Sequence, residues 1–437
     1  MASQNGPEWI SWLQKKVAFF LLLSLMLSTI FLLSVWYSSH SFTFTAKETL
    51  RKTSLATDHL KQNLRPQKPY DGAASSDLPD GDLSFTIDES CDISIGKWVR
   101  ESRGPVYSNL TCSFIPEMNN CQKYGKPPGY LYWRWKPDGC DLPWFEPKRF
   151  LHLVRGKKLA FVGDSIARNQ FESLLCLLSQ ADTTIQIEGN STSKYRTMHF
   201  QSSNFTLMVM WSEYYVQAVP NTNCDAIGCF DLYLDKVNLN WTSRLPGLDY
   251  LVISGGNWYF RKNYLYVNDT LIGCINCNEE NLKDFGTVYA IRSALRKALE
   301  SINSCQSCCG LKTFVRTYSS AHFENGAWFN GGDCNRTVPF NKSEINLYGY
   351  QSEVAKIQNE EVERIKGSNV VDNDNRKYFG VLDVTEAMMG RADGHPGGYY
   401  NKHRKTANDC LHWCLPGPVD MWNEMLMHNL IKTSSLG

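Results

Sequence analysis

The sequence carries almost no net charge, and this limits what it can bind. Its 437 residues include 45 lysines and arginines and 44 aspartates and glutamates, which leaves a formal net charge of +1. Such a balance gives no global electrostatic attraction to nucleic acid, so a polymer bound by this chain is expected to be neutral or weakly charged. The sequence also lacks internal repeats and a nucleotide-phosphate loop. With 43% hydrophobic residues, the chain can bury a large core.

A long apolar run occupies residues 17–36, "VAFFLLLSLMLSTIFLLSVW". It has about the 20 residues that a helix needs to cross a bilayer. A cleaved signal peptide is the alternative, but no Ala-x-Ala-like cleavage site follows the run. Lys15 and Lys16 precede the run, and no lysine or arginine follows until Lys47. We therefore predict a signal anchor with a cytoplasmic tail at 1–16 and the rest of the chain in the lumen.

Sequons and cysteines agree with a lumenal location. Fifteen cysteines are present, and most of them punctuate loops as a disulfide framework does, with at least one left unpaired by the odd count. Asn-x-Ser/Thr sequons predict N-glycosylation in such a compartment. The sequons begin at Asn109, Asn190, Asn204, Asn240, Asn268, Asn335 and Asn341.

Three regions of different texture follow the predicted anchor. Residues 37–89 are polar and rich in Pro, Gly, Ser and Asp, which is typical of a flexible stem. Residues 90–143 are dense in cysteine and aromatic residues and have few periodic patterns, which predicts a loop-rich cap. In residues 144–437, apolar runs such as "KLAFV" and "LDYLVISGG" alternate with helical patterns such as "IARNQFESLLCLL". This alternation predicts an α/β fold with a central, mostly parallel sheet flanked by helices.

The stretch "FVGDSIARNQF" contains a candidate nucleophile. It predicts a strand, a sharp turn at Gly163 and a helix from Ile166 onward. Ser165 would lie at the helix N-terminus, where free backbone N–H groups and the helix dipole favour the oxyanion that a serine nucleophile creates. The alternative is structural, because Asp164 or Ser165 can simply cap the helix.

A nucleophilic serine also needs a base and a group that orients the base. In "ANDCLHWCLPGPVDMWNE", Asp409 and His412 are three residues apart, so one helical or tight turn would project both side chains to the same side. Cys410 and Cys414 would tie this loop down. A zinc site built from the same cysteines and histidine is the alternative.

Other candidate partners lie elsewhere in the domain. His395 follows Asp393 by two residues in "RADGHPGGY" and is a rival base, whereas His322 is expected to be structural or to lie near the substrate. Asn257 follows the strand-like "YLVISGG", so its amide and the backbone N–H of Ser165 are candidate oxyanion donors. An asparagine that holds its own loop is the alternative.

Together these motifs resemble the serine esterase and acyltransferase superfamily named for its Ser, Gly, Asn and His blocks. "FVGDSIARNQFESLLC", "GGNWYF", "HFENGAWFNGGDC", "RADGHPGGY" and "DCLHWCLPGPVDMWNEML", behind a cysteine-rich segment and an anchor, look like the trichome-birefringence-like family of plant polysaccharide O-acetyltransferases. The resemblance covers residues 90–434. It implies Golgi enzymes of type II topology that acetylate cell-wall polysaccharides through an acetyl-serine.

The resemblance also assigns roles to residues. It makes Ser165 the nucleophile, His412 the general base and Asp409 the residue that orients it, which decides against His395 as the base. It implies disulfides between Cys91 and Cys140 and between Cys112 and Cys176. Three further residues in the same motifs are predicted to contact the substrate, and these are Arg168, Trp258 and His395.

The expected function is acetyl transfer to a hemicellulose hydroxyl. The extra cysteines and "GGNWYFR" resemble the branch of the family that acts on xyloglucan, so xyloglucan is the expected acceptor. Alternatives are xylan, mannan or pectin as acceptor, a polysaccharide acetyl esterase, and a non-catalytic carbohydrate-binding protein. No bound cofactor and no metal are expected, and the acetyl donor is acetyl-CoA or another carrier. The cysteines of "CINC" and those at 305, 308 and 309 are expected in disulfides rather than in a zinc ribbon.

Overall fold

The computed structural model describes residue 29 and residues 91–224, 228–368, 377–400 and 407–434. The predicted tail, anchor and stem lie outside these ranges, apart from Thr29. Contacts between Cα atoms divide the chain into residues 1–84 and 85–437, and the second unit contains the elements described below. Within the described ranges, no helix combines the length and the apolar character needed to cross a membrane.

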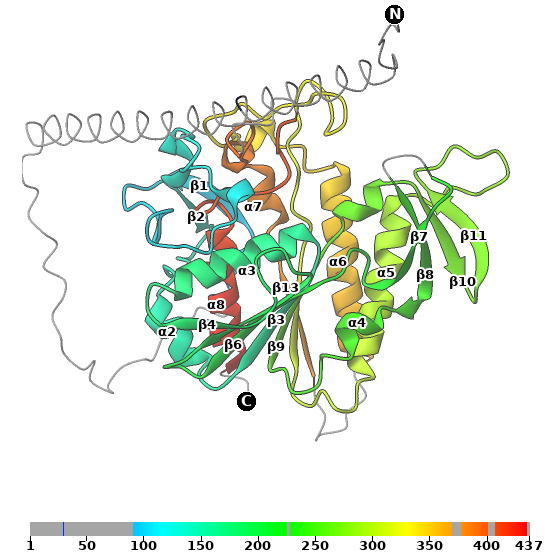
Figure 1. Ribbon diagram of the computed structural model, residues 1–437, viewed down its shortest axis with the longest axis horizontal. Helices are drawn as coiled ribbons and strands as arrows, with labels where there is room; N and C mark the ends of the chain where they lie inside the picture. Colours follow the sequence, from blue (N-terminus) through cyan, green and yellow to red (C-terminus); the bar gives the residue numbers. More distant parts are fainter. Residues whose placement is uncertain (1–28, 30–90, 225–227, 369–376, 401–406, 435–437) are drawn as a thin grey trace, which may run out of the picture. The chain divides into compact units, whose positions relative to one another are not determined.

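A seven-stranded sheet organises the domain (Figure 1). Its strand order is β13 (Tyr378–Leu382), β12 (Lys312–Arg316), β9 (Tyr250–Ser254), β3 (Lys158–Gly163), β6 (Phe205–Trp211), β5 (Tyr195–Phe200) and β4 (Thr184–Glu188). The strands from β13 to β6 pair in parallel, whereas β5 is antiparallel to β6 and β4 to β5. The α/β prediction is confirmed. The prediction of a mostly parallel sheet holds for the five strands that carry the predicted apolar runs.

Side-chain alternation along the strands builds a core on each face of this sheet. On β3, Leu159 and Phe161 belong to one buried cluster, and Ala160 and Val162 belong to the other. The first cluster includes side chains from α3 (Ser165–Leu178) and α8 (Asp420–Ser434), and the second includes side chains from α5 (Thr287–Asn303) and α6 (Tyr350–Gly367). Figure 1 shows these helix pairs on opposite sides of the strands.

A second sheet has no counterpart in the sequence analysis. Its order is β11 (Thr270–Ile275), β10 (Asn263–Val267), β8 (Cys229–Val237) and β7 (Val216–Asn221), with only β10 and β8 parallel among its pairs. It was missed because β7 and β11 lack a regular alternation of buried and exposed residues. The remaining helices and 3-10 turns are α2 (Pro147–Leu153), α4 (Leu239–Thr242), α7 (Thr385–Met389), η1 (Glu117–Asn119), η2 (Pro128–Leu131), η3 (Asn257–Phe260), η4 (Lys342–Glu344) and η5 (Ala392–Gly394).

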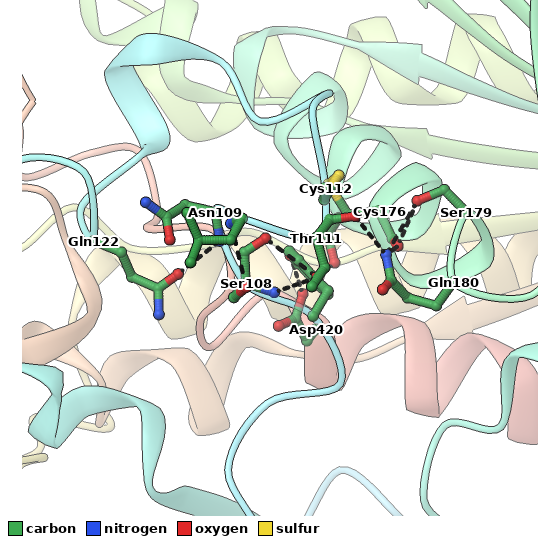
Figure 2. Close-up of a disulfide and its surroundings, with 12 residues drawn as sticks. Ser108, Asn109, Thr111, Cys112, Gln122, Cys176, Ser179, Gln180 and Asp420 are labelled. Carbon is green, nitrogen blue, oxygen red and sulfur yellow. Dashed lines mark hydrogen bonds between the residues drawn. A yellow bond between two sulfur atoms is a disulfide. The ribbon is translucent and has the colours of Figure 1, made fainter. Parts of the chain in front are cut away.

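The cysteine-rich segment forms a cap with one antiparallel strand pair, β1 (Gly96–Arg100) and β2 (Trp133–Pro137). Disulfides hold it, and Figure 2 shows the one that joins Cys112 of the cap to Cys176 in α3. Beside it, the side-chain amide of Gln180 donates to the carbonyl oxygen of Thr111, 3.3 Å away. The described disulfides are Cys91–Cys140, Cys112–Cys176, Cys121–Cys414, Cys224–Cys229, Cys274–Cys277, Cys305–Cys308 and Cys334–Cys410. Cys309 remains as an exposed free thiol.

Candidate active site

Ser165 lies where the strand order of the sheet reverses. It begins α3, two residues after the end of β3, and the chain adds β6 on one side of β3 and later β9 on the other side. Ligands of open α/β sheets bind at such a point. Gly163 lies so close to β9 that a Cβ there would meet the carbonyl oxygen of Ser254 at 1.7 Å. Only a residue without a Cβ therefore fits at this position beside β9. Asp164 caps α3, because its carboxylate accepts the backbone N–H of Ile166 at 2.9 Å, so the Ser165 hydroxyl is not used as the cap.

The structure brings Ser165, His412 and Asp409 together. The Oγ of Ser165 is 2.8 Å from Nε2 of His412, and Nδ1 of His412 is 2.8 Å from Oδ2 of Asp409. The other carboxylate oxygen of Asp409 accepts the backbone N–H groups of Leu411 and His412, at 3.1 and 2.9 Å. Asp409 therefore fixes both the imidazole and the loop that carries it. This is the geometry of a serine nucleophile, its base and the group that orients the base.

Electrostatics match this arrangement. Burial acts to lower the pKa of His412, but the charge and hydrogen bond of Asp409 outweigh it and raise the pKa above the ordinary 6.5. Burial acts to raise the pKa of Asp409, but the contacts with His412 and the two backbone N–H groups hold it at about 2. Asp409 is therefore ionised at neutral pH and stabilises the imidazolium that forms when His412 takes a proton.

Covalent and backbone contacts hold the loop that carries His412. Cys410 is bonded to Cys334 and Cys414 to Cys121, so a disulfide lies on each side of the histidine. Asp409 exchanges two backbone hydrogen bonds with Gly397, at 2.8 and 3.0 Å. A base held in this way is ready for proton transfer without first being ordered. Because both loop cysteines are in disulfides, they do not offer thiolates to zinc.

Asn257 lies at the same edge of the sheet as Ser165. It follows β9, the parallel neighbour of β3, and begins η3. Its side-chain oxygen accepts a hydrogen bond from the Tyr318 hydroxyl at 3.0 Å. This leaves the amide NH₂ as the donating end of the side chain. The oxyanion role of Asn257, shared with the backbone N–H of Ser165, stays a prediction that this orientation favours.

Two family models match the chain. The model described as "GDSL/SGNH-like Acyl-Esterase family found in Pmr5 and Cas1p", the PC-Esterase family, matches residues 142–429, well over half of the chain. The chain belongs to the PC-Esterase family. The model described as "PMR5 N terminal Domain" matches residues 89–141, ahead of the first match.

Curated plant proteins are similar to this PC-Esterase chain over most of its length. Xyloglucan O-acetyltransferase 4 of Populus trichocarpa is 46% identical over 343 residues, which cover 78% of this chain and 81% of that protein. Xyloglucan O-acetyltransferase 2 of Arabidopsis thaliana is 43% identical over 368 residues, which cover 83% of this chain and 87% of that protein. Protein trichome birefringence-like 20 of Arabidopsis thaliana is 39% identical over 355 residues, which cover 79% of this chain and 73% of that protein. The predicted membership of the trichome-birefringence-like family is confirmed.

Arg168 and Trp258, two predicted substrate contacts of the PC-Esterase domain, lie beside Trp211. The guanidinium of Arg168 donates to the carbonyl oxygen of Ser193 at 2.7 Å and lies 4.9 Å from the centre of the Trp211 ring. The Trp258 ring contacts Trp211 edge-on at 6.3 Å, and the guanidinium of Arg261 lies 4.2 Å above it. Trp258 is only half-buried. Both residues keep their predicted role as hypotheses.

His395 is a correction to the predicted substrate contacts. Its side chain is completely buried, with a relative exposure of 0%. Its ring stacks on Trp413 with the ring centres 3.9 Å apart, and its nitrogens face His322 and the carbonyl oxygen of His412. The sequence signal failed because a glycine- and proline-rich motif indicates a loop but not its burial.

Two residues of the PC-Esterase site were not found from the sequence. Asn169 lies one helical turn after Ser165 on α3 and bonds the backbone of Trp413. The i, i+4 spacing from Ser165 was a signal for a residue on the same face of the helix. Tyr318 follows β12 at the sheet edge that carries Ser165, but no motif marked it.

Proposed function

We propose that this protein transfers acetyl groups to hydroxyls of xyloglucan through an acetyl ester on Ser165. One observation carries the proposal, namely the contact of 2.8 Å between Ser165 Oγ and His412 Nε2, with Asp409 behind the imidazole. The acceptor follows from the curated relatives named xyloglucan O-acetyltransferases, which are 43–46% identical over about 80% of the chain. Xylan, mannan and pectin are the other acceptors to be tested.

In the first half of the reaction, Nε2 of His412 takes the hydroxyl proton of Ser165 while Oγ attacks the acetyl carbonyl carbon of the donor. The carbonyl oxygen becomes an oxyanion, and the backbone N–H of Ser165 at the start of α3, with the Asn257 amide, stabilises it. The oxyanion then collapses and the donor leaves with the proton from His412. The acetyl group remains as an ester of Ser165. The donor is acetyl-CoA or another acetyl carrier.

In the second half, a sugar hydroxyl gives its proton to His412 and attacks the acetyl-serine. The second oxyanion accepts hydrogen bonds from the same donors. Its collapse releases the acetylated sugar, and Ser165 regains its proton from His412. Asp409 stays ionised throughout, because its pKa is about 2. The same residues therefore serve both half-reactions, and the enzyme ends each cycle unchanged.

Hydrolysis is the second candidate function, and the family description "Acyl-Esterase" favours it. If water replaces the sugar hydroxyl, the same steps release acetate and leave the polymer unacetylated. Transfer and hydrolysis differ only in the nucleophile that reaches the acetyl-serine, so the product separates them.

The location in the cell is part of the proposal. We place the protein in the Golgi membrane as a single-pass type II protein, with residues 17–36 as the anchor, 37–89 as the stem and the two matched domains in the lumen. Seven disulfides support an oxidising compartment. Among the sequon asparagines, Asn109 is half-buried, and the other six are exposed and accessible to a glycan.

The test uses the full chain and its Ser165→Ala variant with acetyl-CoA and deacetylated xyloglucan, xylan, mannan and pectin. Ser179→Ala, just beyond the far end of α3, is the matched control and should keep full activity. We expect acetylated xyloglucan from the wild type and a loss of at least about 10⁴-fold in Ser165→Ala. Acetate that depends on Ser165 without acetylated polymer would support the esterase. Polymer binding without either product would support the non-catalytic alternative.

A further inference from the structure

A half-buried histidine and a fully buried one face each other beside the proposed catalytic loop. His322, in the segment after β12, places its Nδ1 2.7 Å from Nε2 of His395, which follows η5. Their ring centres are 5.0 Å apart, and Trp413 packs against both rings. Neither histidine belongs to the triad, although each is in contact with the loop that carries His412.

The outer nitrogens of the two rings both face carbonyl oxygens. Nε2 of His322 is 3.1 Å from the backbone oxygen of Met389, and Nδ1 of His395 is 2.7 Å from the backbone oxygen of His412. A carbonyl oxygen can only accept a hydrogen bond, so each outer nitrogen must carry a proton. A neutral imidazole has one proton, and two neutral rings would spend both protons on these outer contacts.

The inner contact then requires a third proton. Without it, lone pairs of His322 Nδ1 and His395 Nε2 would face each other at 2.7 Å and repel. We propose that His322 and His395 share one additional proton, and that the resulting imidazolium pair holds the carbonyl group of His412 in place. The pair is a positioning device for the proposed base and does not touch the reacting atoms.

Charges around the pair act in both directions. Burial lowers the pKa of both histidines, that of His322 to about 4. The shared proton is therefore kept only where the three hydrogen bonds and the surrounding charges stabilise the cation more than burial destabilises it. The groups that favour the proton are the carboxylates of Asp393, Glu324 and Asp409, and those that oppose it are the cations of Arg336 and Lys126. The Trp413 ring, stacked on His395 at 3.9 Å, offers its π face to a cation.

The pair is connected to the catalytic loop at two points. The backbone N–H of His322 donates to the carbonyl oxygen of Cys410 at 2.9 Å, and His395 Nδ1 donates to the carbonyl oxygen of His412. These carbonyls lie two residues apart, one on each side of Leu411. If the shared proton leaves, one of the three contacts must be given up, because two neutral rings have only two protons for three contacts. When the contact given up is that of His395 Nδ1, the carbonyl oxygen of His412 loses its donor. The position of His412 therefore depends on this proton.

The first test measures folding and needs no substrate. His395→Gln keeps the contacts without a charge, because the two amide protons of glutamine can donate to the His412 oxygen and to His322. A shared proton that stays on the pair at neutral pH requires a pKa above the ordinary 6.5 of histidine, against the lowering that burial alone causes. The stabilisation is then complete below pH 6.5 and is lost as pH rises through that pKa. Above pH 6.5 the unfolding constant of the full-length wild type, divided by that of His395→Gln, should rise about tenfold per pH unit up to that pKa. A ratio that stays constant above pH 6.5 overturns the proposal.

The second test rests on the proposed function and uses kcat and KM of the same proteins. In the wild type, kcat should fall as pH rises through the pKa of the pair, and His395→Gln should lack this fall. His395→Phe keeps a ring on Trp413 but removes the contact with His412, so kcat should drop by up to about 100-fold with KM unchanged. The same fall in both wild type and His395→Gln, or an unchanged kcat in a folded His395→Phe, argues against the pair. If no acetyl transfer is detected in the wild type, the folding test still decides.

Discussion

Asn169 holds the backbone of Trp413, the residue directly after His412. Its side-chain oxygen accepts the Trp413 N–H at 2.8 Å, and its NH₂ lies 3.4 Å from the Trp413 carbonyl oxygen. Asn169 is one turn after Ser165 on α3, so the helix that carries the nucleophile also holds the loop that carries the base. The distance between Ser165 and His412 therefore does not depend on the loop alone.

Asn169→Ala should lower kcat by about 10- to 100-fold and leave KM unchanged, because the base moves while the substrate contacts remain. It should also destabilise the fold by about 1–3 kcal/mol, since the buried Trp413 N–H loses its acceptor. Steady-state kinetics and denaturant unfolding measure the two effects. Gln180→Ala, past the other end of α3, is the control. A wild-type kcat in Asn169→Ala would show that the disulfides suffice to place His412.

The pH dependence of acetyl transfer should follow His412. His412 must be neutral to accept the Ser165 proton, and its pKa is raised by Asp409, so kcat should rise with pH through a value above 6.5. Asp409→Asn removes the charge that raises this pKa, so the rising limb should move to lower pH and the plateau should fall by about 10⁴-fold. A pH–rate profile of both proteins tests this, and an unmoved limb in Asp409→Asn would assign it to another group.

The same pair of shifts links stability to pH. The raised pKa of His412 gives stabilisation that is complete below pH 6.5 and is lost as pH rises through the folded-state value. The lowered pKa of Asp409 gives stabilisation that is present above the ordinary 3.8 and is lost as pH falls toward about 2. Both stabilising contributions are therefore present together between about pH 4 and pH 6.5. The difference in unfolding free energy between wild type and Asp409→Asn should therefore be largest in the window between pH 4 and 6.5 and smaller on either side.

The oxyanion role of Asn257 predicts a graded pair of effects. Asn257→Ala should reduce kcat by about 10²–10³-fold, which is the loss of one oxyanion donor. Tyr318→Phe should raise the activation free energy of acetyl transfer by only about 0.5–1.5 kcal/mol. The Tyr318 hydroxyl orients the Asn257 amide and does not itself bond the oxyanion. Equal losses in the two variants would mean that Tyr318 itself contacts the reacting group. An unchanged kcat in Asn257→Ala would instead support the alternative that Asn257 only holds its own loop.

The disulfide between Cys121 and Cys414 should affect both stability and activity. It joins the cap to the catalytic loop across a sequence separation of 293 residues, two residues from His412. Replacing both cysteines by alanine should lower the unfolding free energy by about 2–4 kcal/mol and reduce kcat. Cys224 and Cys229 are five residues apart, so the same replacement there should change little and is the control. Equal effects would mean that the cap does not position the base.

Local pattern was sufficient for the central strands, for α3 and for the candidate nucleophile, whereas His395 stayed a rival to His412 until the family resemblance decided between them. The apolar runs that became β3, β9 and β12 are short and continuous because these strands are buried on both faces. β6 and β13 keep some half-exposed positions. The second sheet was not predicted, because β7 and β11 lack a regular alternation of buried and exposed residues. Pro220 in β7 also made that strand unlike a central one.

The sequence by itself determined which residues have the chemistry of acyl transfer, because a serine at a strand-to-helix turn and an Asp-x-x-His loop are local patterns. Only the tertiary structure decided that Ser165 meets His412, that Asn169 and two disulfides hold the base, and that His395 is buried against His322. Burial and contact distance are set by the packing of segments far apart in the chain, and no local pattern contains that information. For this reason His395, a predicted substrate contact, was found buried and paired with His322.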